Sequence, residues 1–356
     1  MKKVLLLLML LVPFGASAFS SNAKGAILMD MDGGRIMYAK NAHYVQSVAS
    51  ISKIMTALVA IENSDVNKKI VVGDEILKAY GSGIYVKQGE KIKLEDLIYG
   101  LMLRSGNDAA LVIAKAVAGS KNNFVKLMND KANSLGMRDT VFNNPSGLDE
   151  NEEKGNFSSA YDMALLMSYA MQNSEFRKIT GTKKHTVKTN KNIYVWHNKN
   201  KLLNGYKYVN GGKTGFTKKA RRTLVTTASK DDLNLVVVTI NDGSDWADHR
   251  KLFTEAFSKY KSYTFMDKGE ISVLGENYYN NDTLYIKKNL KYPLLEGEKG
   301  AIFLKYKLNK KRKYKSLDKV GKVEVYIGDK VVTDRDVFVK KGRVKDKTDF
   351  FSKLFK

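Results

Sequence analysis

A serine followed three residues later by a lysine opens an apolar segment near the start of the chain, and this pair constrains the fold most. Apolar side chains recur at helical spacing from residue 51 to 59, which predicts a helix that begins near Ser50 and buries one face. Residues three apart on a helix are neighbours, so Ser50 and Lys53 share a face. An amine beside a hydroxyl is the arrangement of a serine nucleophile and its base. Taken alone, the spacing also fits an N-cap serine and a solvated lysine.

A second polar stretch, Ser105-Gly106-Asn107, separates two apolar segments with helical character, residues 94–103 and 109–118. On its own it fits a loop in which Asn107 caps the second helix. It has the form Ser-x-Asn, so it also offers a hydroxyl and an amide close together in the chain.

A third stretch, Lys213-Thr214-Gly215, precedes a strand-like segment at residues 222–228. On its own it fits a strand end interrupted by glycine, which lets the backbone approach a ligand or another chain segment closely. Together and in this order, Ser-x-x-Lys, Ser-x-Asn and Lys-Thr-Gly form the triple signature of penicillin-recognising serine enzymes. The joint requirement lowers a chance match to roughly a few per cent.

Over most of residues 22 to 260, the chain resembles the D-alanyl-D-alanine carboxypeptidases, the low-molecular-mass penicillin-binding proteins. Besides the three motifs, this resemblance is carried by residues 25–30, 101–109, 144–149 and 158–164. It implies an α/β catalytic domain of the β-lactamase and transpeptidase type, an antiparallel sheet with a helical cluster. The strand-rich sequence that follows resembles the small all-β C-terminal domain of the same family.

The chain is expected to divide into four segments. A charged start, an apolar run from Val4 to Pro13 and the small residues Ala16-Ser17-Ala18 predict a signal peptide over residues 1–18. The serine peptidase domain is expected over residues 22–264. The composition then shifts to lysine-rich strands, which predicts a β-rich domain over residues 265–345. Residues 346–356 place four apolar side chains on one helical face beside lysines, which is typical of an amphipathic membrane anchor.

Charge and cysteine content limit the cellular setting and the partners. The net charge is +24, from 61 basic and 37 acidic residues, which favours anionic surroundings such as a membrane surface. Nucleic acid is not expected as a partner, because the lysines are scattered and no recognition module is present. The absence of cysteine excludes disulfides and thiolate metal sites. We expect an exported enzyme at the extracytoplasmic, periplasmic face of the cell membrane, peripherally anchored.

The resemblance implies a mechanism of acyl transfer to serine. Ser50 attacks the carbonyl between two D-alanines of a peptidoglycan stem peptide, the terminal D-alanine leaves, and water hydrolyses the acyl-enzyme. Lys53 is the base, and burial together with a second nearby cation would lower its pKa from about 10.4. Ser105 relays a proton to the leaving amine, and Asn107 binds the substrate amide. β-Lactam antibiotics would act as covalent inhibitors of the same serine.

The third motif is expected to bind substrate. The resemblance assigns the terminal carboxylate to Lys213 and Thr214, and it places Gly215 and Phe216 beside the reacting carbonyl, with an oxyanion hole formed by the backbone N–H groups of Ser50 and Phe216. Some relatives carry an arginine after the last strand of the catalytic domain, where this chain has residues 242–246. Arg221 or Arg222 could take over that role here. No cofactor or metal is expected, since the four histidines lack metal-ligand spacing.

Three alternatives share parts of this evidence. A peptidoglycan DD-endopeptidase of the same fold differs only in the shape of its cleft. A β-lactamase shares all three motifs but needs a group for rapid deacylation, and no Glu-x-x-x-Asn motif lies between Ser105 and Lys213. A non-catalytic peptidoglycan-binding protein could retain the fold without turnover.

Overall fold

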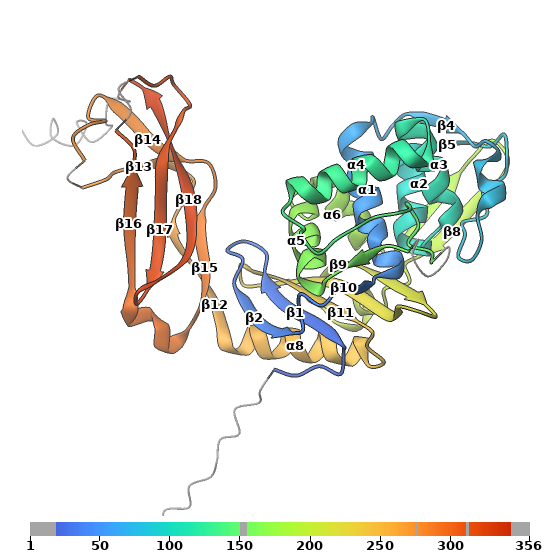
Figure 1. Cartoon of the computed structure of the whole chain (residues 1–356), viewed down its shortest axis with the longest axis horizontal. Coiled ribbons are helices and arrows are strands. Elements are labelled where there is room, and N and C mark those ends of the chain that lie inside the picture. The colour runs from blue at the N-terminus through green and yellow to red at the C-terminus, as the bar shows by residue number, and fades with distance from the viewer. Residues whose placement is uncertain (1–18, 150–154, 275, 311–312, 343–356) are drawn as a thin grey trace, which may run out of the picture.

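The computed structural model describes residues 19–149, 155–274, 276–310 and 313–342. The segments predicted as signal peptide (1–18) and amphipathic tail (346–356) lie outside these residues. The described chain forms two parts side by side, a larger N-terminal part with sheet and helices and a smaller part made of strands (Figure 1). Across the described residues, we find no helix whose length and hydropathy would allow it to cross a bilayer.

The larger part is organised around an antiparallel five-stranded sheet with the strand order β2-β1-β11-β10-β9. The first and last segments of this part therefore meet in one sheet, because β1 pairs with β11 along its whole length. The strands are β1 (Gly25–Asp30), β2 (Ile36–Lys40), β9 (Val209–Thr217), β10 (Arg221–Lys230) and β11 (Leu233–Ile240).

Both faces of this sheet are covered, which explains why its central strands read as nearly continuous apolar runs. Alternate residues of a strand point to opposite faces. Val236 and Val238 accordingly pack into the core beneath the helical cluster, whereas Leu235 and Val237 belong to the core on the other face, which a long helix and a short one line. The long helix, α8 (Asp245–Lys259), contacts β10 and β11.

Most of the remaining helices form the cluster that covers the first face of the sheet (Figure 1), whereas the short α7 (Leu202–Gly205) packs with α8 on the other face. The α-helices of the cluster are α1 (Lys53–Asn63), α2 (Leu94–Tyr99), α3 (Asn107–Ala118), α4 (Lys121–Ser134), α5 (Ala160–Ala170) and α6 (Ser174–Gly181). Short turns precede or extend them: the 3₁₀ turns η1 (Ala49–Ser52) and η2 (Asp74–Lys78), and the π-helical turn η3 (Gly100–Arg104).

Three two-stranded pairings fasten loops of the cluster. They are β3 (Gln46–Ser47) with β6 (Phe157–Ser158), β4 (Lys69–Val71) with β5 (Lys91–Lys93), and β7 (Lys184–Lys188) with β8 (Ile193–His197).

The smaller part contains a second antiparallel sheet and a two-stranded ribbon. The sheet has the order β13-β14-β18-β17-β16, and the ribbon pairs β12 with β15. Valines of β17 and β18 form its core with Leu284 and Ile286. The bounds are β12 (Tyr260–Met266), β13 (Gly269–Ile271), β14 (Asp282–Ile286), β15 (Leu290–Leu295), η4 (Glu296–Ala301), β16 (Ile302–Leu308), β17 (Lys319–Ile327) and β18 (Lys330–Lys341).

The turn between β1 and β2 connects the two parts. Arg35 donates from both terminal nitrogens to the Glu298 carboxylate, each at 2.7 Å, and its guanidinium lies over the rings of Tyr260 and Tyr292. Arg335 of β18 reaches back and donates to the backbone oxygen of Asp32 at 2.8 Å. Bidentate arginine–carboxylate contacts fix orientation as well as distance, so this junction holds the parts in a defined arrangement.

Two predicted helices differ from the structure in detail. The expected helix at Ser50 begins as the 3₁₀ turn η1 and becomes α-helical only at Lys53. In a 3₁₀ turn, side chains three apart are eclipsed, which brings Ser50 and Lys53 closer than the predicted α-helix would. The apolar segment 94–103 is divided into α2 and η3 at Gly100, a position where Ile84 packs too closely for a side chain.

Candidate active site

Ser50 lies in η1, between the sheet and the helical cluster. Its side chain is half-buried, and its Oγ donates to the backbone oxygen of Ser146 at 3.4 Å. Strand β9 passes directly against this turn, since a Cβ built on Gly215 would lie 3.0 Å from the backbone nitrogens of Ser50 and Ile51. Thr223 of the neighbouring strand donates to the backbone oxygen of Val48 at 3.1 Å, which ties η1 to the sheet.

Lys53 is completely buried beside Ser50, and its ammonium group is held by oxygen atoms only. Nζ donates to Ser50 Oγ at 2.9 Å, to Asn107 Oδ1 at 2.7 Å and to the backbone oxygen of Ser146. None of these acceptors is charged. Burial therefore holds the pKa of Lys53 well below its ordinary value, and the nearby positive charges of Lys213 and Lys199 lower the pKa further.

Ser105 and Asn107 enter the site from the junction of η3 and α3. Ser105 is buried in a left-handed conformation, φ 63°, and its hydroxyl makes no hydrogen bond to another described residue. Asn107 is not the helix cap that its position suggests: Gly106 holds that place. The Asn107 Nδ2 instead donates to the backbone oxygen of Tyr80 at 2.6 Å, which orients Oδ1 toward Lys53.

Lys213 and its neighbours approach from β9, the edge strand of the sheet. The Lys213 side chain is buried and its Nζ donates to the backbone oxygen of Thr214 at 2.7 Å. Burial and the charge of Lys199 lower the pKa of Lys213 to about 7. Thr214 and Gly215 are partly accessible, and the Phe216 side chain is exposed.

Arg222 belongs to the opposite side of the sheet. On the strand ladder Arg222 pairs with Phe216, and the next residue, Thr223, pairs with Gly215. Gly215 and Thr223 are the residues that approach η1. Its guanidinium binds the Asp245 carboxylate of α8 through Nη2, at 2.6 Å, and Nε, at 3.2 Å. Since alternate residues face opposite sides, the alternative that Arg222 binds a substrate carboxylate beside Ser50 finds no support in this arrangement.

The loop that carries Ser146 is part of the site, although no catalytic role for this loop was predicted from the sequence. The backbone oxygen of Ser146 accepts from both Ser50 and Lys53. Asn144 holds the loop by accepting from the backbone nitrogen of Gly147 at 2.7 Å. Gly147 has φ +78°, and a Cβ there would lie 2.1 Å from the backbone oxygen of Ala49. The only sequence signal for this loop is the Asn-Pro-Ser-Gly turn at residues 144–147, which lies far from the three motifs in the chain.

Lys199 is a second residue that sequence reasoning missed. Its Nζ donates to Ser82 Oγ at 3.2 Å and its backbone nitrogen to Leu103 at 3.1 Å. Burial and the nearby Arg104 lower the pKa of Lys199. Its charge in turn lowers the pKa values of Lys53 and Lys213, so Lys199 contributes to the electrostatics of the site from outside its centre.

The histidines do not converge on this site. His249 is buried in the sheet–α8 layer, where its ring nitrogens contact Thr226 Oγ1 at 2.6 Å and Thr239 Oγ1 at 3.0 Å. Within the part of the chain that the structure describes, no three histidine or carboxylate side chains are arranged to hold a metal ion.

The family model of the D-alanyl-D-alanine carboxypeptidases, Peptidase_S11, matches residues 13–244, which is well over half of the chain. The chain belongs to this family. It is therefore a hydrolase of the D-Ala-D-Ala carboxypeptidase type, and the family predicted from the three motifs is confirmed.

Individual relatives agree with this assignment. The chain is 32% identical over 286 residues to the D-alanyl-D-alanine carboxypeptidase DacF of Bacillus subtilis, covering 75% of this chain and 73% of that protein. The crystal structure of a D-alanyl-D-alanine carboxypeptidase from Mycobacterium tuberculosis is 30% identical with a TM-score of 0.65, covering 69% of this chain and 95% of the other. DacD from Francisella tularensis, 25% identical with a TM-score of 0.68, covers 91% and 94% respectively. The last match includes the C-terminal β domain and confirms the predicted fold class.

Proposed function

We propose that this enzyme removes the terminal D-alanine from peptidoglycan stem peptides through an acyl-enzyme on Ser50, with Lys53 as the base. The observation that carries the proposal is the buried Lys53 Nζ, 2.9 Å from Ser50 Oγ and surrounded by uncharged acceptors. A serine hydroxyl is a weak nucleophile until a neighbouring base takes its proton. A lysine can act as that base only when it is neutral, and burial favours its neutral form.

In the first step, Ser50 Oγ attacks the carbonyl between the two D-alanines, and its proton passes to Lys53. The bond to the terminal D-alanine then breaks, and the leaving amine receives a proton through Ser105. In the second step, water attacks the acyl-enzyme and returns Ser50 to its starting state. Asn107 binds the substrate amide, a role that suits an amide side chain already fixed by Tyr80 and Lys53.

Substrate is held along β9 in this proposal. Lys213 and Thr214 bind the terminal carboxylate of the peptide, which requires Lys213 to be charged when substrate enters. The backbone N–H groups of Ser50 and Phe216 stabilise the oxyanion, and the close approach of Gly215 to η1 supports this pairing. A donor of this kind contributes about 3 kcal/mol to transition-state stabilisation. The same geometry would accept β-lactams as covalent inhibitors.

The proposed setting is extracytoplasmic. A signal peptide at residues 1–18, export, and binding of the amphipathic tail to an anionic membrane surface are supported by the sequence pattern and by the net charge of +24. The domain limits at residues 22–264 and 265–345 belong to the same proposal. Removal of residues 346–356 should release the protein from envelope membranes, and unchanged partitioning would contradict the anchor.

The test of the reaction is D-alanine release from a synthetic peptide that ends in D-Ala-D-Ala. We expect release by the parent and loss in both Ser50→Ala and Lys53→Ala, while fluorescent penicillin labels the parent but not Ser50→Ala. Labelling without release, with cleavage of cross-linked muropeptides, would identify an endopeptidase. Rapid hydrolysis of penicillin would identify a β-lactamase. If the protein showed no labelling and no release, it would be a non-catalytic binding protein.

A further inference from the structure

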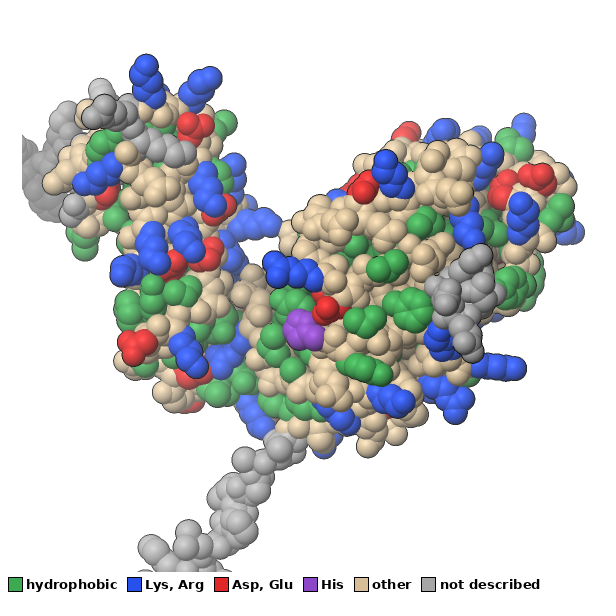
Figure 2. Space-filling view, viewed as in Figure 1, with side chains coloured by type: hydrophobic (Ala, Val, Ile, Leu, Met, Phe, Trp, Pro, Cys, Tyr) green, Lys and Arg blue, Asp and Glu red, His purple; other side chains and the backbone are tan. Residues whose placement is uncertain are grey.

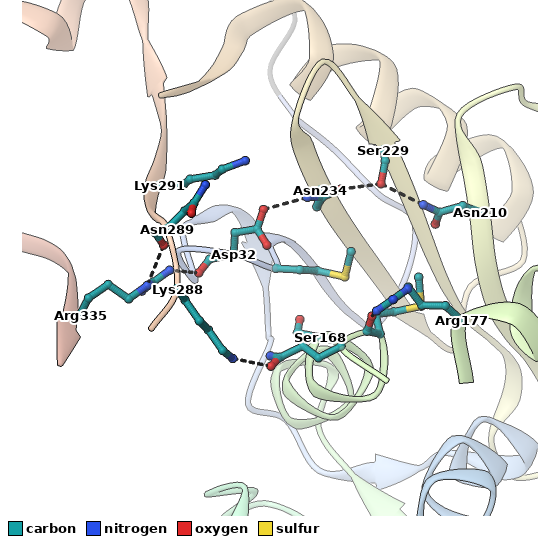
Figure 3. Close-up of a pocket in the computed structure, with 13 residues that line it drawn as sticks. Asp32, Ser168, Arg177, Asn210, Ser229, Asn234, Lys288, Asn289, Lys291 and Arg335 are labelled. Atoms are coloured by element: carbon teal, nitrogen blue, oxygen red, sulfur yellow. Dashed lines mark hydrogen bonds between the residues drawn. The ribbon is translucent and has the colours of Figure 1, made fainter. Parts of the chain in front are cut away.

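A hollow of about 600 Å³ opens between the two domains, away from the residues of the serine site. Figure 3 shows Ser168, Arg177, Asn210 and Ser229 on its catalytic-domain side and Lys288, Lys291 and Arg335 on its C-terminal side. Asp32, in the turn between β1 and β2, lies between the two walls. The hollow is therefore built by both domains and exists only in their docked arrangement.

The walls carry four basic side chains and few opposing charges. Lys288 Nζ donates to the amide oxygen of Gln172 at 2.7 Å, and Arg177 Nη1 donates to the backbone oxygen of Met171 at 2.7 Å. Arg335 donates only to backbone oxygens, those of Asn289, Asp334 and Asp32. In the described chain, none of these three cations has a carboxylate within 4 Å. Lys291 has one, the exposed carboxylate of Asp232 at 3.7 Å.

The one acidic side chain among the lining residues does not offset this excess. The Asp32 carboxylate accepts from Asn234 Nδ2 at 2.8 Å. That asparagine continues a chain of hydrogen bonds through Ser229 to Asn210, at 2.6 and 2.9 Å. This polar wall is thus satisfied internally. Four cations stand against the carboxylates of Asp32 and of Asp232, the partner of Lys291, which leaves a formal excess of two positive charges.

We propose that this hollow binds a phosphate-bearing ligand with at least two negative charges, a diphosphate or a phosphate monoester, which contacts both domains at once. Arginine and lysine side chains are the usual ligands of phosphate oxygens, and a multiply charged anion matches the excess better than a single carboxylate. The phosphate could belong to a soluble molecule or to a lipid headgroup. The site takes no part in the chemistry at Ser50, and the proposal is independent of the proposed reaction.

The test uses the full chain, with pyrophosphate as the soluble probe, by titration calorimetry at about 0.15 M ionic strength, where charges more than about 8 Å apart are largely screened. The double variant Arg177→Gln with Lys288→Gln removes one cation from each wall. Its matched control, Lys68→Gln with Lys305→Gln, removes the same charge from one exposed lysine in each domain, outside the hollow. We expect pyrophosphate to bind the pocket variant at least about ten-fold more weakly and the control unchanged.

Equal weakening in both variants, or no saturable binding to the parent, would overturn the proposal. Vesicles of phosphatidylglycerol, compared with phosphatidylcholine, distinguish the two sources of phosphate. Weaker vesicle binding by the pocket variant assigns the site to a lipid headgroup, whereas unchanged vesicle binding with weaker pyrophosphate binding assigns it to a soluble phosphate. Penicillin labelling of both variants should match the parent, because none of the four residues contacts Ser50, and a single cooperative thermal transition shows that each variant is folded.

Discussion

Gly147 offers a sharp test of how the active-site loop holds the catalytic lysine. Alanine at this position adds a Cβ that would lie 2.1 Å from the backbone oxygen of Ala49 and 2.5 Å from Ser52 Oγ. The loop must therefore retreat by more than about 1 Å to reach ordinary contact distance, since close-packed interiors tolerate little overlap. That movement carries the neighbouring Ser146 oxygen away from Lys53 Nζ.

Gly136→Ala is the matched control. Gly136 has nearly the same backbone, φ +74° against +78°, but nothing lies within 4 Å of its added Cβ. Both substitutions carry the left-handed strain of about 1 to 2 kcal/mol, partly offset by about 0.4 to 1 kcal/mol from the stiffer unfolded chain. Only Gly147→Ala adds overpacking, about 1 to 3 kcal/mol, and the loss of a buried hydrogen bond, about 1 kcal/mol or more.

We therefore expect Gly147→Ala to lower the free energy of unfolding by about 3 kcal/mol and Gly136→Ala by about 1 kcal/mol. Because misplacing a catalytic group by about 1 Å can cost about 100-fold in rate, kcat/KM for D-alanine release should fall about that much in Gly147→Ala alone. Urea denaturation and steady-state kinetics on both variants measure these effects. If the two variants matched in stability and activity, the reasoning about this contact would be refuted.

Because the pKa of Lys213 is lowered to about 7, kcat/KM should fall as the pH rises through about 7 and the carboxylate-binding charge is lost. In Lys213→Arg, which stays charged, this fall should move to higher pH. An unchanged pH profile would assign the fall to another group. Burial lowers the pKa of His249 from 6.5 to about 3. Neutral His249 therefore makes its full contribution to the free energy of unfolding above pH 6.5, and about 4 to 5 kcal/mol of that free energy is lost as the pH falls toward 3. His249→Gln should flatten this part of the curve of stability against pH, measured by urea denaturation, and an unchanged slope would contradict the assignment. Arg35→Met removes the bidentate contact to Glu298 and should broaden the distance distribution in small-angle scattering while leaving D-alanine release intact, whereas an unchanged distribution would show that the junction does not depend on this pair.

Much of the sheet and of the motif geometry could be predicted from the sequence because their signals are local. The hairpin of β10 and β11 reads directly from two apolar runs around residues 229–232, and Ser50 and Lys53 share a face through their spacing alone. The juxtaposition of Ser105, Asn107 and Lys213 with Ser50 required the family resemblance, since no periodicity reports contacts between distant segments.

What could not be predicted depends on long-range packing. Ser146 contacts Lys53 across 93 residues through a backbone oxygen, and any residue type would present such an atom. Lys199 is one lysine among many in the sequence, and only the folded chain brings its charge close enough to lower the pKa values of Lys53 and Lys213. The interdomain hollow depends on the docking of Arg35 and Arg335, for which the chain offers no local pattern.

The path from α8 into the ribbon has a mechanical consequence. Helix α8 packs on the catalytic sheet and ends at Lys259, and β12 begins at Tyr260 with no loop between them. Strand β15 then pairs with β12 from Tyr260 to Met266, so two strands rather than one would have to flex together, at the cost of ladder hydrogen bonds. The ribbon is therefore a stiff connection, which fixes the direction in which the C-terminal domain extends from the catalytic domain.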